Sequence, residues 1–320
     1  MFNPAFPLNN RHLQTLYAPL FRKQPKPKVE LERFGLSDGD FVDAYWHNEK
    51  PTNNAPIVIL FHGLAGSFDS PYIQGVMRAL EKKGFASVLM HFRGCSGKPN
   101  LLPRSYHSGE STDAKEWIEH LHTTYPNNTL YAVGYSIGGN MLLKYLGEEQ
   151  ENTPLQAAVS VSAPMDLDVC AEVITQGFAR NYEQYLLKPL RLALKEKFDT
   201  HDMSKLLTLK REEIDEIETI KEFDEHYTAP IHGFKSAQDY YNKCSSKQFL
   251  KHIAIPTHII HAVDDPFMDK RILPKEEEIS SFVTLELTKH GGHVGFVSGS
   301  LFKPVYWLEE RIVRYFVEQD

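Results

Sequence analysis

The stretch TLYAVGYSIGGNMLLKYL, residues Thr129–Leu146, decides the fold of this chain, because an apolar run changes there into a helical pattern. The apolar run ends at Gly134, and a lone hydroxyl at Ser136 follows between small residues. Such a hydroxyl is either part of a structural turn or a nucleophile. The pattern G-x-S-x-G between a strand and a helix favours the nucleophile, since small neighbours permit the strained turn that exposes the serine. A serine there also stands at a helix N-terminus, where free N–H groups stabilise a developing oxyanion.

Strands and helices alternate along the rest of the chain. Apolar, β-branched runs predict strands within 56–63, 85–94, 130–133, 155–164, 256–265 and 282–293, after a hairpin within 29–48. Helical spacing follows in segments such as 70–84 and 111–126, and a terminal helix is expected over 306–319. This alternation predicts an α/β fold with a mostly parallel, eight-stranded sheet that helices cover on both faces.

Residues 165–249 interrupt the alternation, because they contain no good strand pattern. Apolar residues recur at helical spacing from Leu187 to Phe198, and the segment is rich in Glu and Lys, as solvated helix faces usually are. We therefore predict a helical cap of residues 165–249, inserted between the sixth and seventh strands. Residues 1–164 and 250–320 are predicted to form the core. The apolar stripes of the cap are expected to pack against this core, and some can line a substrate pocket.

The composition indicates an ordinary globular protein and excludes some partners. The 320 residues carry a net charge of −7, so the mean field favours neither nucleic acid nor an anionic membrane surface. A short basic run, residues 21–30, is interrupted by prolines and is interpreted as a connector. Three cysteines without a CxxC pattern indicate reduced thiols. No signal peptide is apparent and the longest apolar run, Ile57–Phe61, is too short to span a membrane, so we expect a soluble, cytoplasmic protein.

A nucleophilic serine needs a base, and the base needs an orienting carboxylate. His293 is the better candidate base, because the two glycines before it allow a loop to carry it back over the sheet. His290 is expected to end the strand or to support that loop. Two adjacent acids, Asp264 and Asp265, come at the end of the strand within 256–265, and either could be the carboxylate.

The oxyanion formed by attack on a carbonyl needs N–H donors beside the nucleophile. Ile137, directly after Ser136, supplies one donor. The loop FHGLAGS, residues Phe61–Ser67, follows an earlier strand, and Leu64 within it is the expected second donor. His62 in the same loop is interpreted as a structural residue rather than a second base.

Other chemistries have weaker signals in this sequence. Cys95 has no base that the sequence makes visible, so a cysteine nucleophile is not expected. The HxxH pair of His290 and His293 lacks both the HExxH pattern and a third ligand, so no metal is predicted. No cofactor is predicted either, and Arg93 is expected to tie neighbouring loops together.

With these residues assembled, the chain resembles the α/β-hydrolase superfamily over most of its length. The chain order of serine, aspartate and histidine is the order of that superfamily. The more specific resemblance is to the YheT-like branch of esterases, which is related to the eukaryotic abhydrolase-domain lipases. It is carried by NRHLQTL (Asn10–Leu16), DGDFVDAYW (Asp38–Trp46), FDEHYTAPIHGFKSAQDYY (Phe223–Tyr241) and AVDDPF (Ala262–Phe267).

The resemblance implies a cofactor-free serine esterase with Ser136 as nucleophile and His293 as base. In related enzymes the acid stands three residues after a small residue and precedes an apolar pair, which Asp265 after Ala262 fits better than Asp264. The implied substrates are small-molecule or lipid-like esters, such as short- to medium-chain acyl esters and monoacylglycerol-like lipids. The alternatives are a thioesterase, amidase or peptidase with the same triad, or a non-catalytic binding protein of this fold. The oligomeric state is left open.

Overall fold

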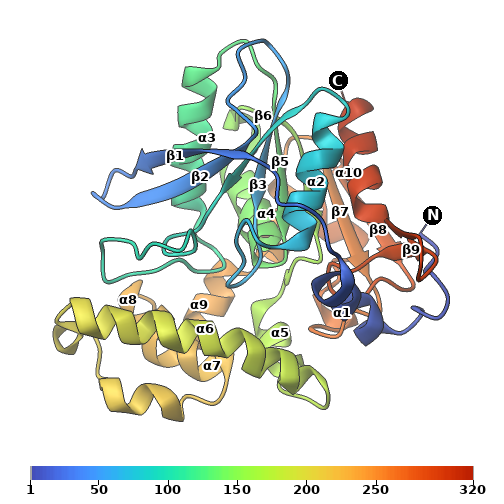
Figure 1. Cartoon of the computed structure of the whole chain (residues 1–320). Coiled ribbons are helices and arrows are strands. Elements are labelled where there is room, and N and C mark those ends of the chain that lie inside the picture. The colour runs from blue at the N-terminus through green and yellow to red at the C-terminus, as the bar shows by residue number, and fades with distance from the viewer. Residues whose placement is uncertain (1, 320) are drawn as a thin grey trace.

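The computed structural model describes residues 2–319, and its centre is one eight-stranded sheet between two layers of helices (Figure 1). The strands are β1 Val29–Gly35, β2 Phe41–His47, β3 Ile57–Phe61, β4 Ala86–Met90, β5 Leu130–Tyr135, β6 Leu155–Val161, β7 Thr257–Ala262 and β8 Val283–Thr288. Their spatial order is β1-β2-β4-β3-β5-β6-β7-β8. All eight predicted strands are present, and the predicted fold class is confirmed.

The sheet is mostly parallel, and its parallel strands end at a common edge. Strands β3 to β8 run in one direction, whereas β2 runs against both of its neighbours. The register pairs Phe61 at the end of β3 with Met90 and with Gly134. The loops after these strands therefore meet at one edge, which is where open α/β sheets bind their ligands.

Helices cover both faces of this sheet. The helices are α2 Pro71–Glu81 and α10 Trp307–Val317 on one face, and α3 Ser111–Thr124 and α4 Ile137–Glu149 on the other. One apolar cluster joins α2 and α10 to the sheet around Val58, and the other joins α3 and α4 to it around Ile59. Because both faces are covered, β3 is buried along its whole length, as its unbroken apolar sequence requires.

Between β6 and β7 the chain is helical, as the sequence predicts. The helices of this segment are α5 Leu167–Val173, α6 Ala179–Thr200, α7 Ile220–Phe223, α8 Ala229–Ile231 and α9 Ala237–Cys244. Figure 1 shows α6 and α7 beyond one end of the sheet. The segment has its own apolar cluster, which includes Leu187, Leu194 and Phe223, so the periodic leucines pack within the segment and not against the core as expected. The division into a core and a separate cap domain stays a prediction.

Three short elements have no counterpart in the sequence prediction. Helix α1 spans Arg11–Phe21, and the strands β9 Val297–Gly299 and β10 Pro304–Tyr306 form a small antiparallel hairpin. Pro19 lies inside α1, and strands of three residues are too short to show alternation. Among residues 2–319, no helix is both long enough and apolar enough to cross a membrane. The cytoplasmic location stays a prediction.

Arg93, which follows β4, joins three parts of the molecule through buried ion pairs. Its guanidinium donates to both carboxylate oxygens of Asp113 in α3, each at 2.7 Å. It also donates to Asp40 at 2.9 Å and to Asp38 at 2.8 Å, both in the turn between β1 and β2. Arg93 is only 2% exposed. The arginine therefore fastens the antiparallel edge of the sheet to α3, in the way the sequence suggests.

Replacing Arg93 by Met should destabilise the fold strongly, because the variant leaves buried carboxylates without their cation. We expect the free energy of unfolding to fall by about 3–5 kcal/mol. Chemical denaturation followed by circular dichroism measures this change. Arg271→Met is the matched control, because Arg271 makes only exposed ion pairs, and its loss should change the free energy of unfolding little. Equal losses in the two variants would show that the Arg93 network has no special role.

Candidate active site

The backbone at Ser136 has a conformation that L-residues rarely adopt, with φ 54° and ψ −121°. The residue lies between the end of β5 and the start of α4. A Cβ atom at Gly134 would lie 2.4 Å from the carbonyl oxygen of Gly138, and one at Gly138 would lie 2.5 Å from that of His62. Both glycines of the G-x-S-x-G pattern are therefore needed for the close approach of strand, turn and helix.

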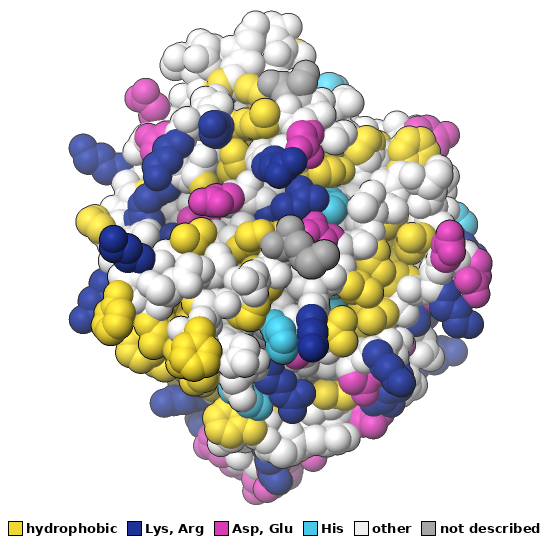
Figure 2. All heavy atoms as spheres, turned by 90° about the vertical axis from the view of Figure 1, so that its right-hand side faces the viewer, with side chains coloured by type: hydrophobic (Ala, Val, Ile, Leu, Met, Phe, Trp, Pro, Cys, Tyr) yellow, Lys and Arg dark blue, Asp and Glu magenta, His cyan; other side chains and the backbone are white. Residues whose placement is uncertain are grey.

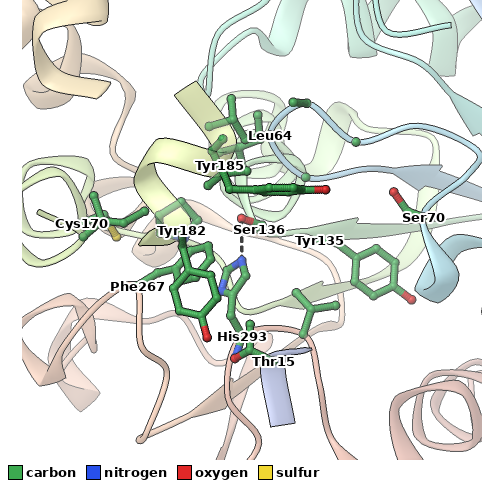
Figure 3. A pocket seen from close by; sticks show the side chains of 18 of the residues that line it. Thr15, Leu64, Ser70, Tyr135, Ser136, Cys170, Tyr182, Tyr185, Phe267 and His293 are labelled. Carbon is green, nitrogen blue, oxygen red and sulfur yellow. Dashed lines mark hydrogen bonds between the residues drawn. The ribbon is translucent and has the colours of Figure 1, made fainter. Parts of the chain in front are cut away.

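Ser136, His293 and Asp265 form a continuous hydrogen-bonded chain. Nε2 of His293 lies 3.0 Å from Oγ of Ser136 (Figure 3), and Nδ1 lies 2.8 Å from Oδ2 of Asp265. A carboxylate only accepts hydrogen bonds, so the imidazole proton belongs on Nδ1. The lone pair of Nε2 then faces the serine hydroxyl. The imidazole can therefore take the proton from Ser136 and later give it to another atom that occupies the same position.

The two adjacent acids have different partners. Asp265 is 1% exposed and its second oxygen accepts from the N–H of Phe267 at 2.9 Å. Asp264 instead lies 3.2 Å from Nδ1 of His290 and accepts from the N–H of Gly292 at 3.0 Å. The structure therefore brings Asp265 to His293, whereas Asp264 and His290 hold the loop that precedes His293.

The two expected oxyanion donors lie beside the serine. Leu64 and Ile137 both line the cavity that contains Ser136. Ile137 begins α4, so its N–H has no acceptor within the helix. The N–H groups on either side of Leu64, those of Gly63 and Ala65, donate to tyrosine hydroxyls at 3.0 and 2.9 Å. Across residues 2–319, neither the Leu64 nor the Ile137 N–H donates to a protein group, which leaves both available to a ligand.

Helix α1 supports the loop of His293, and the sequence prediction missed this role. The backbone N–H of His293 donates to Oγ1 of Thr15 at 2.9 Å. The amide of Gln14 donates to the carbonyl of Val297 at 3.0 Å and accepts from its N–H at 2.7 Å. A Cβ at Gly292 would lie 2.5 Å from the carbonyl oxygen of Arg11. The stretch Asn10–Leu16, which carries the family resemblance, contained a signal for this role, because the polar residues Gln14 and Thr15 stand there between two leucines.

Two other candidates of the sequence analysis, the buried His62 and the partly buried Cys95, have no free reactive group. Burial lowers the pKa of His62 to about 3, and its Nε2 accepts from the N–H of Phe92 at 3.1 Å. His62 is therefore a neutral residue that joins two loops. Burial raises the pKa of the Cys95 thiol to about 12, so the thiolate that a cysteine nucleophile requires is absent at neutral pH.

One cluster among the described residues offers atoms of the kinds that bind metals. Ligand atoms of His107, Glu110 and His232 lie within 4.8 Å of one another. Glu110 already accepts from Arg104 at 2.8 Å, and the two imidazole rings pack edge to face with centroids 4.5 Å apart. These contacts join the helical segment to the loop before α3.

Ser136 and His293 face a cavity of about 910 Å³ (Figure 3). The helical segment between β6 and β7 supplies much of its wall, with Leu167, Ile174, Phe178, Leu190, Ile220 and Phe223. Helix α1 supplies another part, with Leu16, Pro19 and Leu20. The ring of Phe267 stacks on the imidazole of His293, with centroids 4.0 Å apart and 14° between the planes. The reactive group therefore stands at the boundary of a largely apolar space.

The comparisons with known proteins agree with this fold. Residues 56–300 match the family described as the alpha/beta hydrolase fold, and the chain belongs to that family. The chain is 45% identical to YheT of Escherichia coli (strain K12) over 312 residues, which are 97% of this chain and 91% of YheT. The resemblance to the YheT-like branch is thereby confirmed.

Two further comparisons concern proteins with a stated activity. The chain is 28% identical to phospholipase ABHD3 of Mus musculus over 95% of this chain and 75% of that protein. The solved structure of the Pyrococcus furiosus esterase PF2001 has a TM-score of 0.60 at 18% identity, covering 100% of this chain and 97% of that chain. The prediction that the protein is an enzyme of the hydrolase class is confirmed by its relatives.

The strain at Ser136 generates a prediction about stability. Glycine adopts a positive φ freely, so Ser136→Gly should release about 1–3 kcal/mol of strain and lose about 0.4–1 kcal/mol through its more flexible unfolded chain. We expect Ser136→Gly to be about 1 kcal/mol more stable than Ser136→Ala, which also lacks the hydroxyl. Urea denaturation of both variants measures the difference. A glycine variant that is less stable than the alanine variant would show that the turn is not strained.

Proposed function

We propose that this protein hydrolyses carboxylic esters through a serine nucleophile and an acyl-enzyme. The observation that carries the proposal is the position of His293, with Ser136 at 3.0 Å from one ring nitrogen and Asp265 at 2.8 Å from the other. The free N–H groups of Leu64 and Ile137 support it, because acyl transfer needs donors where the oxyanion forms. The similarity to a phospholipase supports an ester as the substrate.

The first half of the reaction forms the acyl-enzyme. Oγ of Ser136 attacks the ester carbonyl carbon while Nε2 of His293 takes the hydroxyl proton. Asp265 holds the Nδ1 proton and stabilises the imidazolium ion that results. The N–H groups of Leu64 and Ile137 donate to the oxyanion, and in a protease one such donor contributes about 3–4 kcal/mol. The imidazolium then gives its proton to the leaving alcohol oxygen as the ester C–O bond breaks.

The second half of the reaction releases the acid. A water molecule takes the place of the alcohol, and His293 removes one of its protons as the oxygen attacks the acyl carbon. The same donors hold the second oxyanion. When the bond to Oγ of Ser136 breaks, His293 returns the proton to the serine. Apart from the ester and the water molecule, the residues of the chain supply every group that these steps use.

The cavity indicates which part of the substrate is bound most closely. Its apolar wall, which includes Leu167, Ile174 and Phe223, suits the acyl chain of a short- to medium-chain ester or of a monoacylglycerol-like lipid. Thioesters, amides and peptide bonds can react with the same three residues, because the triad sets acyl transfer and not the leaving group. We place the carboxylic ester first because a relative is named a phospholipase.

Ser136→Ala should abolish turnover, because the variant has no nucleophile to acylate. We expect kcat for a p-nitrophenyl butyrate substrate to fall about a millionfold, as in a protease without its serine. A fluorophosphonate probe should label the wild-type protein and leave Ser136→Ala unlabelled. Wild-type turnover in the variant would contradict the assignment of Ser136 as the nucleophile. A wild-type protein that the probe leaves unlabelled would favour a non-catalytic binding protein.

The adjacent acids Asp265 and Asp264 provide a matched pair of variants. Asp265→Asn should lower kcat about 10⁴-fold, because the amide no longer fixes the imidazole in the required tautomer. Asp264→Asn removes only loop hydrogen bonds and should lower kcat less than about tenfold. Steady-state kinetics of both variants on the same ester measures the ratio. If Asp264→Asn is the more damaging variant, the pairing of Asp265 with His293 is not the functional one.

A further inference from the structure

The N-terminal segment has a charge opposite to that of the rest of the protein. Residues 1–29 contain five Lys or Arg residues and no Asp or Glu. The net charge of −7 for the whole chain therefore leaves −12 for residues 30–320. The negative net charge of the whole chain argues against an anionic surface as a partner, but it does not reveal that the N-terminal segment is positive. The basic residues that follow α1 directly, Lys23, Lys26 and Lys28, are all exposed.

Helix α1 has its polar side inside and its apolar side outside. In α1, every residue of which the structure describes, the one buried residue is Gln14. Three of its large apolar residues, Leu13, Leu20 and Phe21, are exposed, Phe21 to 65%, whereas Leu16 and Tyr17 are partly buried. A helix on the surface of a globular protein ordinarily has the reverse arrangement. The inner side holds the loop of His293, whereas nothing in the described chain covers the outer one.

The apolar side of α1 continues onto the hairpin of β9 and β10. The hydroxyl of Tyr17 donates to the carbonyl of Leu301 at 2.7 Å, which fixes the hairpin turn against the helix. Phe302, the next residue in that turn, is 96% exposed. Phe6, which is 85% exposed, lies beside the same hairpin through a bridge to Ser300. Figure 2 shows the side of the molecule that carries these elements, with hydrophobic side chains gathered beside lysines and arginines.

The same apolar side reaches the mouth of the catalytic cavity. Leu20 of α1 and Phe178 and Tyr185 at the start of α6 line the cavity, yet each is more than half exposed. The rings of His12 and Phe178 lie 4.5 Å apart, which joins α1 to this rim. An apolar rim in contact with water is unfavourable unless something covers it. We call the exposed residues Phe6, Leu13, Leu20, Phe21, Phe178 and Phe302 the docking face.

We propose that the docking face binds the surface of an anionic phospholipid bilayer. The apolar side chains would enter the interfacial region, and the lysines behind Phe21 would contact anionic headgroups, as in other interfacial helices. A second copy of this chain is a poorer occupant, because a two-fold contact would bring two cationic N-terminal segments together. Docking places the cavity mouth against the lipid, so that an ester can enter it directly. That last step rests on the proposed function, whereas the docking itself does not.

Vesicle flotation with the full chain tests the docking. We use Ser136→Ala so that no lipid is hydrolysed, with vesicles of phosphatidylcholine plus phosphatidylglycerol, and with phosphatidylcholine alone. We expect at least about tenfold tighter binding to the anionic vesicles, and a loss of that preference in high salt. Failure of the ester hydrolase proposal would leave this result unchanged, because the assay requires no turnover.

Two variants assign the contact to the docking face. Phe21→Ser with Phe302→Ser removes exposed apolar groups, and Lys23→Gln with Lys28→Gln removes two cations; each pair should weaken binding about 10- to 30-fold. None of these residues lines the cavity, so hydrolysis of a water-soluble ester by the same variants in a wild-type background should be unchanged. Leu206→Ser with Lys210→Gln, beyond the far end of α6, is the matched control and should bind as before.

Three outcomes overturn the proposal. The first is absence of binding to anionic vesicles, and the second is equal loss in the control and the docking-face variants. The third is a concentration-dependent dimer in analytical ultracentrifugation that Phe302→Ser dissociates, because it would assign the face to a second copy. Circular dichroism of each variant verifies that the exposed substitutions leave the fold intact.

Discussion

The close approach of β5 and α4 at Ser136 is the constraint on which the rest of the site depends. A single Cβ at Gly134 or Gly138 would meet backbone atoms at 2.4 or 2.5 Å, so strand and helix can meet there only without side chains. That contact keeps Ser136 at a positive φ and lifts its hydroxyl out of the sheet edge. It also frees the N–H of Ile137, since the helix begins at that residue. One packing contact thus presents the proposed nucleophile and one proposed oxyanion donor together.

The second requirement is a loop that holds an imidazole at a fixed distance from that hydroxyl. The loop of His293 contains glycines, so its own residues do not restrict it to one backbone conformation. Groups from outside hold His293 itself: Asp265 bonds the ring, Phe267 stacks on it, and Thr15 accepts from its backbone N–H. Thr15 is 278 positions away in the chain. The N-terminal helix is thus as much a part of the proposed site as the C-terminal half of the sheet, although it contributes no reacting atom.

The sequence could predict the features that depend on interactions between residues close together in the chain, and it could not predict those that depend on distant residues. The parallel strands and the turn at Ser136 are visible because burial on both faces and backbone crowding act over a few neighbouring residues. The residues themselves left the choice between Asp264 and Asp265 open, and only the family resemblance favoured Asp265, since adjacent side chains leave a loop in different directions that only the folded loop defines. The contacts of Gln14 and Thr15 were missed for the same reason, and α1 itself was obscured by Pro19.

Helix α1 connects the two proposals through its reversed polarity. Its inner side must be polar, because the loop of His293 offers backbone groups that need hydrogen-bonding partners, which Gln14 and Thr15 provide. Polar residues on the inner side explain how the helix can dock with Tyr17 as its contact to a buried apolar cluster, but they do not explain why Leu13, Leu20 and Phe21 face outward. A helix with no task beyond support would gain solubility from polar residues there. The outward leucines and phenylalanine, followed by lysines, are the composition that an interfacial helix requires, and they stand at the mouth of the cavity that a lipid ester would enter.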